Sequence, residues 1–175
     1  MASSKNDMKL GLVIVFIAII VAASTIIGLS LLPPPSSPPL HGEADIQIIK
    51  GETIVDLNFA SLTEMSPTTG NSSAQNRFQN WRDTGEYIGV SLSSLVETVG
   101  GMDENDVVRV NASDGWIQYY AYYNLYPNAT FSTIQGDLIL AYSYNGTTPP
   151  SWSDGPRTVF LPTDGAYSND DANQT

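Results

Sequence analysis

The chain has 175 residues, no cysteine and a formal net charge of −11 at pH 7. Without cysteine, a disulfide, a thiolate metal site and a cysteine nucleophile are all excluded. Beyond residue 40 there are 17 acidic and five basic residues, a net charge of −12. Such a surface repels polyanions, so we expect no nucleic-acid partner.

The first predicted element is a membrane-spanning helix over residues 10–32, where 23 positions carry no charge. A helix of that length extends about 35 Å and can cross a hydrocarbon core of about 30 Å. Lys5 and Lys9 precede the run, and no Lys or Arg follows it until Lys50. This predicts a single-pass protein of the cell membrane with residues 1–9 in the cytoplasm and the rest outside. A cleaved signal peptide is the alternative, but its apolar core is usually shorter and ends in small residues.

Residues 33–42 are the predicted stalk, because the run PPPSSPP favours extended polyproline II structure. Residues 43–175 then form one extracytoplasmic domain, which is long enough to bury a core. The only histidine, His41, lies at the junction. Without a second histidine or a cysteine, we do not expect it to bind a metal.

Within the domain, alternating apolar residues predict strands over 44–49 and 53–59, and a long polar loop follows over 66–84. Ser91 is the predicted N-cap of a helix over 92–99, which Gly100 and Gly101 terminate. Further strands are predicted over 107–111, 116–123, 131–134, 137–144 and 158–161, before a polar tail. This pattern indicates a mostly-β domain, a sandwich or a barrel.

Five Asn-x-Ser/Thr sequons follow the predicted anchor, and none precedes it. N-glycosylation is therefore expected at some of these sites in a host that has the machinery. Asn145 stands in an Asn-Gly turn and is the most exposed candidate. The other sequons are at Asn71, Asn111, Asn128 and Asn173.

Four collinear segments resemble the molybdopterin-binding domain of the sulfite oxidase-like oxidoreductases. They are YIGVSLSSLVETVGG (87–101), DVVRVNASDGW (106–116), DLILAYSYNGTTPP (137–150) and GPRTVFLP (155–162). The resemblance covers about residues 45–165 and implies an α+β fold, mostly β. It also implies molybdopterin as a cofactor and, in catalytic members, a cysteine ligand to molybdenum from the loop before the first segment.

This chain departs from the catalytic pattern because the corresponding loop, 66–84, contains no cysteine. Its cationic side chains are Arg77 and Arg82, which are the candidates for binding a cofactor phosphate. In a strongly acidic domain, two arginines are few for binding an anionic cofactor. We therefore expect the resemblance to extend to the fold but not to the activity, with no bound cofactor. A molybdopterin oxidoreductase with a non-cysteine metal ligand is the enzyme alternative.

Two further groups of residues are candidate sites. On the predicted strand over 116–123, alternation places Trp116, Tyr120 and Tyr122 on one face. That face either belongs to the core or stacks on a flat ligand. Near the C-terminus, oxygen-bearing side chains suit Ca²⁺, although their spacing matches no EF-hand and a solvated acidic tail is the alternative. These side chains are Asp164, Asn169, Asp170 and Asp171.

The N-terminus also resembles that of archaeal pilins, where a charged residue and a glycine precede an apolar helix. Here these are Lys9 and Gly11. This resemblance implies a surface-filament subunit that associates with itself. The sequence thus favours a membrane-anchored binding or structural module, which either self-associates or binds another surface protein. The oxidoreductase and the filament subunit are the alternatives.

Overall fold

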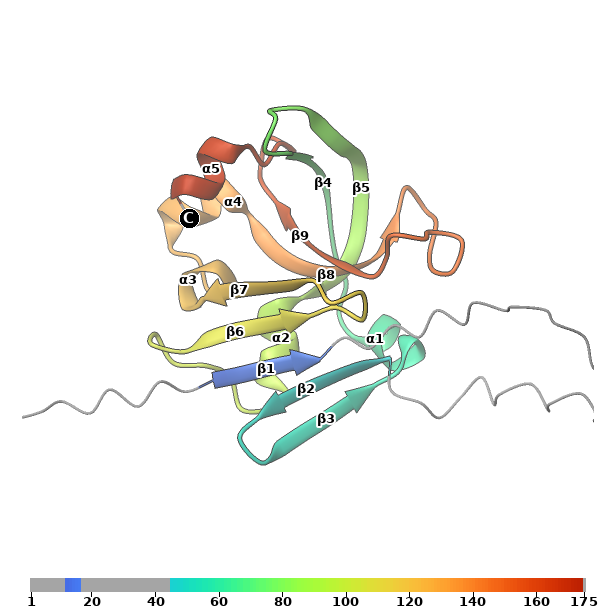
Figure 1. Ribbon diagram of the computed structural model, residues 1–175, viewed down its shortest axis with the longest axis vertical. Helices are drawn as coiled ribbons and strands as arrows, with labels where there is room; N and C mark the ends of the chain where they lie inside the picture. The colour runs from blue at the N-terminus through green and yellow to red at the C-terminus, as the bar shows by residue number, and fades with distance from the viewer. Residues whose placement is uncertain (1–11, 17–44, 175) are drawn as a thin grey trace, which may run out of the picture.

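The computed structural model describes residues 12–16 and 45–174. This part of the chain is α+β and mostly β, with two sheets and several short helices (Figure 1). In chain order the elements are β1 (Leu12–Phe16), β2 (Ile46–Lys50), β3 (Thr53–Leu57), α1 (Phe59–Glu64), β4 (Thr68–Gln75), β5 (Trp81–Ser91), α2 (Leu92–Glu97), β6 (Val107–Asn111), β7 (Ile117–Ala121), α3 (Tyr122–Leu125), α4 (Ala129–Gln135), β8 (Asp137–Tyr144), β9 (Arg157–Leu161) and α5 (Asn169–Gln174).

The first sheet has five strands in the order β3-β2-β1-β6-β7. The strand β1, blue in Figure 1, lies between β2 and β6, antiparallel to the former and parallel to the latter. Its central residue, Ile14, is in register with Ile49 on one side and Arg109 on the other. Because β2 and β6 do not pair with each other, β1 is the strand that joins the two halves of this sheet.

The strand β1 differs from the sequence prediction, which placed residues 12–16 inside a membrane-spanning helix. Val13, Ile14 and Val15 are β-branched and suit a central strand, and a short apolar run does not by itself distinguish strand from helix. The rest of the predicted span, 10–11 and 17–32, lies outside the described residues, as do the stalk and His41. In the described part of the chain, no helix is long and apolar enough to cross a membrane.

The second sheet has the order β4-β5-β8-β9, and all its neighbours are antiparallel. It stands above the first sheet in Figure 1. The predicted polar loop over 66–84 is wrong, because most of it forms β4 and the start of β5. The turn between these strands is fixed by Asn76, whose Oδ1 accepts hydrogen bonds from the backbone N–H groups of Phe78 and Asn80. Pairing along the edge of a sheet explains how so polar a segment becomes a strand.

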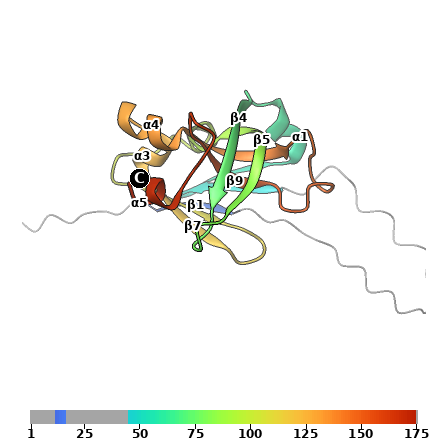
Figure 2. The same ribbon diagram turned by 90° about the horizontal axis from the view of Figure 1, so that it is seen from above.

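The helices agree in part with the prediction. Helix α2 begins at its N-cap Ser91, whose Oγ accepts from the Ser94 N–H, and it is followed by Gly100 and Gly101 at positive φ. The strand predicted over 131–134 is wrong, since these residues lie within α4, whose N-cap is Asn128. The end of the strand predicted over 116–123 is helix α3, and part of the predicted polar tail is α5. Figure 2 shows α3, α4 and α5 gathered at one end of the domain.

The core has two parts because both faces of the second sheet are covered. Leu138, Leu140 and Tyr142 on β8 belong to the larger cluster, together with buried residues of β2, β6 and α2. The alternate residues Ile139 and Ala141 pack in a smaller cluster with Tyr87, Trp152 and Val159. Burial on both faces accounts for the nearly continuous apolar sequence of β8.

Candidate functional site

A cavity with a volume of about 540 Å³ lies between two connecting segments. One segment, 112–116, joins β6 to β7 in the first sheet. The other, 153–158, leads into β9 in the second sheet. A cavity of this size, where the two sheets meet, is large enough for a small organic ligand. It is lined by Val110, Ala112, Ser113, Asp114, Trp116, Ser153, Asp154, Gly155, Pro156, Arg157 and Thr158.

The segment 112–116 is a tight turn that fixes Asp114 and Trp116 next to each other. Asp114 Oδ1 accepts a hydrogen bond of 2.8 Å from the Trp116 N–H. The Ala112 N–H donates to the Trp116 carbonyl over 2.8 Å, and Gly115 supplies the positive φ of +89° that the turn requires. The turn therefore holds the Asp114 carboxylate at the backbone of Trp116, and Trp116 is 48% exposed.

The opposite wall depends on Trp152, which is buried in the smaller cluster beneath the segment 153–158. Its ring lies 6.1 Å from that of Tyr87 and 5.8 Å from that of Tyr144, between centroids. A Cβ atom on Gly155 would lie only 2.2 Å from Trp152 Cε3. Close packing of the indole against the Gly155 backbone thus fixes the course of this wall.

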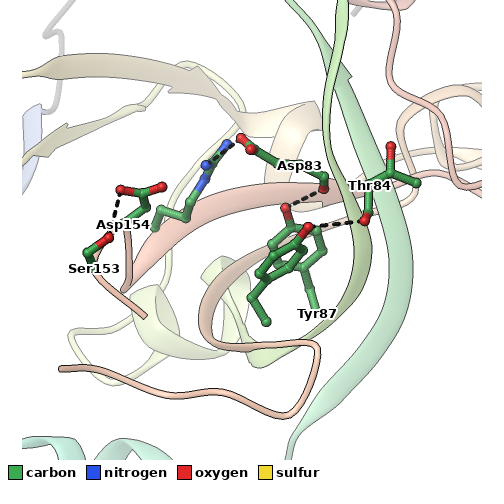
Figure 3. Close-up of polar contacts among 7 residues, drawn as sticks. Asp83, Thr84, Tyr87, Ser153 and Asp154 are labelled. Atoms are coloured by element: carbon green, nitrogen blue, oxygen red, sulfur yellow. Dashed lines mark hydrogen bonds and ion pairs between the residues drawn. The ribbon is translucent and has the colours of Figure 1, made fainter. Parts of the chain in front are cut away.

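Arg157 is the cationic side chain of the cavity, and it is already paired. Its Nη1 lies 2.9 Å from Oδ2 of Asp83, which precedes Thr84 on β5 (Figure 3). The backbone of this stretch is held by two tyrosines. Tyr87 donates to the Asp83 carbonyl over 2.7 Å, and Tyr144 donates to the Thr84 carbonyl over 3.0 Å. Asp83 has a positive φ of 54°, a strained conformation that these contacts maintain.

The electrostatic balance of the cavity is negative. Asp114 and Asp154 are exposed and line it, whereas Arg157 is neutralised by Asp83. Three carboxylates thus accompany one guanidinium. Nearby, burial raises the pKa of Tyr87 to about 12 from its usual value near 10. An anionic ligand is disfavoured here because its charge would add to those of the carboxylates.

The three predicted stacking residues are not brought together. Trp116 lines the cavity, as expected for a stacking residue. Tyr120 is only 6% exposed, belongs to the core and shares a hydrogen bond of 2.7 Å with Thr158 Oγ1. Burial raises the pKa of Tyr120 to about 12, and the bond to Thr158 opposes that effect. Tyr122 starts α3 and stacks on Tyr126, with 4.7 Å between ring centroids.

The two predicted phosphate-binding arginines lie elsewhere. Arg77 stands in the β4–β5 turn, with its guanidinium carbon 4.7 Å from the ring centroid of Phe78. Arg82 is exposed on β5. Neither lines the cavity. Arg157, which is not among the predicted binding residues, does line it. It stands within the fourth segment of the resemblance, which was the signal that could have identified it.

The predicted calcium ligands have other roles. Asp164 Oδ1 accepts from the Ala166 N–H, and the Asn169 amide donates to the Asn76 carbonyl. Asp171 and Ser168 form a reciprocal capping pair at the start of α5. Asp170 is exposed on α5. In residues 12–16 and 45–174, no group of three or more histidine, cysteine or acidic side chains is arranged to hold a metal ion.

The sequons differ in accessibility. Asn71, Asn128 and Asn145 are exposed. Asn145 has a φ of 48° in its turn, and its Oδ1 accepts from the Glu86 N–H over 2.9 Å. Asn111 instead lies on β6 between two paired strands, and its buried Oδ1 has no hydrogen-bond partner among residues 12–16 and 45–174. Asn173 is in α5.

Comparison of the chain with known proteins gives no matching family and no match among the curated proteins. The inference of function therefore depends on the residues of the site.

Proposed function

We propose that this chain is a single-pass membrane protein whose extracytoplasmic domain is a non-catalytic binding module. The proposed anchor and the strand β1 both need residues 12–16, so the two cannot form at the same time. The observation that carries the proposal is the cavity between 112–116 and 153–158. Its lining combines an exposed indole, carboxylates and hydroxyl groups, the mixture of apolar and polar groups typical of ligand sites. No cysteine or histidine is among the lining residues, so the usual pairing of a nucleophile with an imidazole base is missing.

The scaffold that we propose is that of the sulfite oxidase-like molybdopterin-binding domain. In support, its four resembling segments all contribute to ordered elements: β5 with α2, β6 with the turn after it, β8, and β9. The second and fourth segments supply the two walls of the cavity. Gly89, the first of the three glycines in the first segment, lies so close to β8 that a Cβ would be 2.3 Å from the Leu140 carbonyl oxygen. A packing requirement therefore accounts for at least one residue of the resemblance.

The residues of the cavity do not fit a bound molybdenum–pterin group. A soft thiolate ligand is excluded by composition. A pterin phosphate needs free cationic donors, but Arg157 is engaged by Asp83 at 2.9 Å, and Asp114 and Asp154 add negative charge. Binding without redox catalysis is therefore the function we favour. The oxidoreductase is the second candidate, because two segments of the resemblance converge on one cavity.

Elemental and pterin analysis distinguishes these candidates. The full chain would be produced in a host that makes molybdenum cofactor, purified from membranes and analysed for molybdenum by mass spectrometry and for pterin by fluorescence. We expect neither at stoichiometric amounts, and no sulfite or sulfoxide turnover above background. Equimolar molybdenum that is lost in Arg157→Gln, but kept in the control Arg77→Gln, would instead establish the oxidoreductase.

A further inference from the structure

We infer that the cavity selects an organic cation, a quaternary ammonium or amine group that rests on the Trp116 indole and is neutralised by Asp114 and Asp154. This inference rests on the proposed binding function and specifies its ligand class.

The first argument is the state of Trp116. It is 48% exposed, although it lines a cavity and its backbone N–H is bound by Asp114. Among the described residues, no aromatic ring or cationic side chain is found in contact with its indole, whereas Tyr87, Tyr144 and Trp152 pack together nearby. An indole face attracts cations through its quadrupole, and tryptophan does so best among the aromatic side chains.

The second argument is the supply of negative charge at the same place. Asp114 uses Oδ1 to accept the Trp116 N–H, and Asp154 uses Oδ1 for a long bond of 3.3 Å to Ser153. Within the described residues, the second oxygen of each carboxylate makes no hydrogen bond or ion pair. These oxygens are therefore available to a ligand.

The third argument is the single cation of the lining. Arg157 would repel a cationic ligand if it were free, but its Nη1 is bound to Asp83. The charge of the whole domain, −12 beyond residue 40, also raises the local concentration of cations. A neutral sugar could also stack on the indole and donate its hydroxyls to the carboxylates, but only a cation gains in addition from their negative charge. The observations thus favour a cation over a sugar.

The test compares choline with 3,3-dimethyl-1-butanol, which has the same shape without the charge. Binding to the full chain in detergent would be measured by calorimetry at low salt, with glucose and inorganic phosphate as further probes. We expect choline to bind saturably and the neutral isostere to bind about tenfold more weakly or worse. The affinity for choline should fall when the ionic strength is raised.

Variants localise the site. Trp116→Leu should weaken choline binding about tenfold, while the matched control Trp81→Leu, which replaces a tryptophan that is also 48% exposed but lies outside the cavity, should not. Asp114→Asn and Asp154→Asn should each weaken it severalfold. Asp114→Asn keeps the Oδ1 acceptor of the turn, so a folding defect is not expected.

The inference is overturned if choline does not bind, if the neutral isostere binds equally well, or if Trp116→Leu leaves choline binding unchanged. Glucose or phosphate binding that depends on Trp116 would also overturn it, but would retain the proposed binding function. Stoichiometric molybdenum in the purified protein would instead remove the binding function itself.

Discussion

Arg157 on β9 and Asp83 on β5 form an ion pair of 2.9 Å between two strands of the second sheet that are not neighbours. The strand β8 separates them in the sheet order. The pair thus links two strands that share no backbone pairing, at the wall of the cavity. Both side chains are partly exposed, at 33% and 42%. We infer that the pair matters more for the charge of the cavity than for stability, since exposed pairs contribute little.

Replacing Asp83 with asparagine tests whether the ion pair mainly sets the charge of the cavity or the stability of the domain. Asp83→Asn should change the free energy of unfolding by less than about 1 kcal/mol. It should also free Arg157, weaken choline binding severalfold and favour phosphate. Thermal unfolding and calorimetry measure these effects, with Asp56→Asn, an exposed site on β3, as the control. A loss of more than about 2 kcal/mol would show that the pair is mainly structural.

Substitution of Gly89 should have a large effect on the stability of the domain. A Cβ at this position would lie 2.3 Å from the Leu140 carbonyl oxygen and 2.6 Å from the Ala141 Cα, both backbone atoms that cannot rotate away. Gly89→Ala should therefore destabilise the domain by about 3 kcal/mol or more, or prevent folding. Gly70→Ala is the control, because its Cβ would meet only the flexible Leu161 side chain at 3.2 Å. Equal unfolding midpoints for the two variants would contradict this packing.

Local signals predicted the elements that are apolar and regular. The strands β6 and β8 and the capped helix α2 are confirmed, because their burial patterns follow directly from the sequence. The strand β4 was missed because its polar sequence, TTGNSSAQ, becomes a strand only through its pairing with β5. Long-range pairing of this kind leaves no local hydrophobic period.

The site was predictable only in part, for a similar reason. Trp116 and Arg157 both stand in segments of the resemblance, but they are 41 positions apart in the sequence. Their shared cavity depends on how the two sheets meet, which the sequence does not show. Arg77 and Arg82 are the predicted phosphate-binding residues only because the segment that contains them is predicted to be a loop. In β4–β5 they lie on exposed positions away from the cavity.

The stability of the domain should fall at alkaline pH because the buried tyrosine hydroxyls ionise more readily once the chain unfolds. Burial raises the pKa of Tyr120 to about 12 from its usual value near 10. The folded state therefore keeps the proton that the unfolded chain loses. The stabilising contribution of Tyr120 is complete below pH 10 and falls by roughly 3 kcal/mol between pH 10 and 12. Urea unfolding across this range should show a smaller loss of unfolding free energy for Tyr120→Phe than for the unchanged protein. Tyr119→Phe, at a site 57% exposed, should leave the dependence of the unfolding free energy on pH unchanged.

Glycosylation should distinguish an exposed turn from a paired strand. In a host that glycosylates exported proteins, Asn145 should be occupied because its turn is exposed. Asn111 should be unmodified because β6 is paired on both sides and the Asn111 Oδ1 is buried. Peptide mass spectrometry of the native protein measures both sites. Full occupancy of Asn111 with an unmodified Asn145 would contradict the pairing of β6.

The last prediction concerns the segment 12–16, for which a strand in the first sheet and a helix in the bilayer are mutually exclusive. Paired strands bring Cα atoms within the 4.4–6.8 Å that a disulfide requires, and the chain has no native cysteine to interfere. In lipid-free protein, the double variant Ile14→Cys/Ile49→Cys should therefore form a disulfide, because the two residues are in register. In membranes the proposed anchor places residue 14 within the bilayer, so we expect no disulfide there. Because the anchor also places the domain outside the cell, protease added to intact cells should remove the domain. The pair Ile14→Cys/Asp56→Cys is the control, since Asp56 lies on β3, beyond β2. A disulfide between positions 14 and 49 in intact membranes would show that the segment completes the sheet there, and the membrane anchor would have to be abandoned.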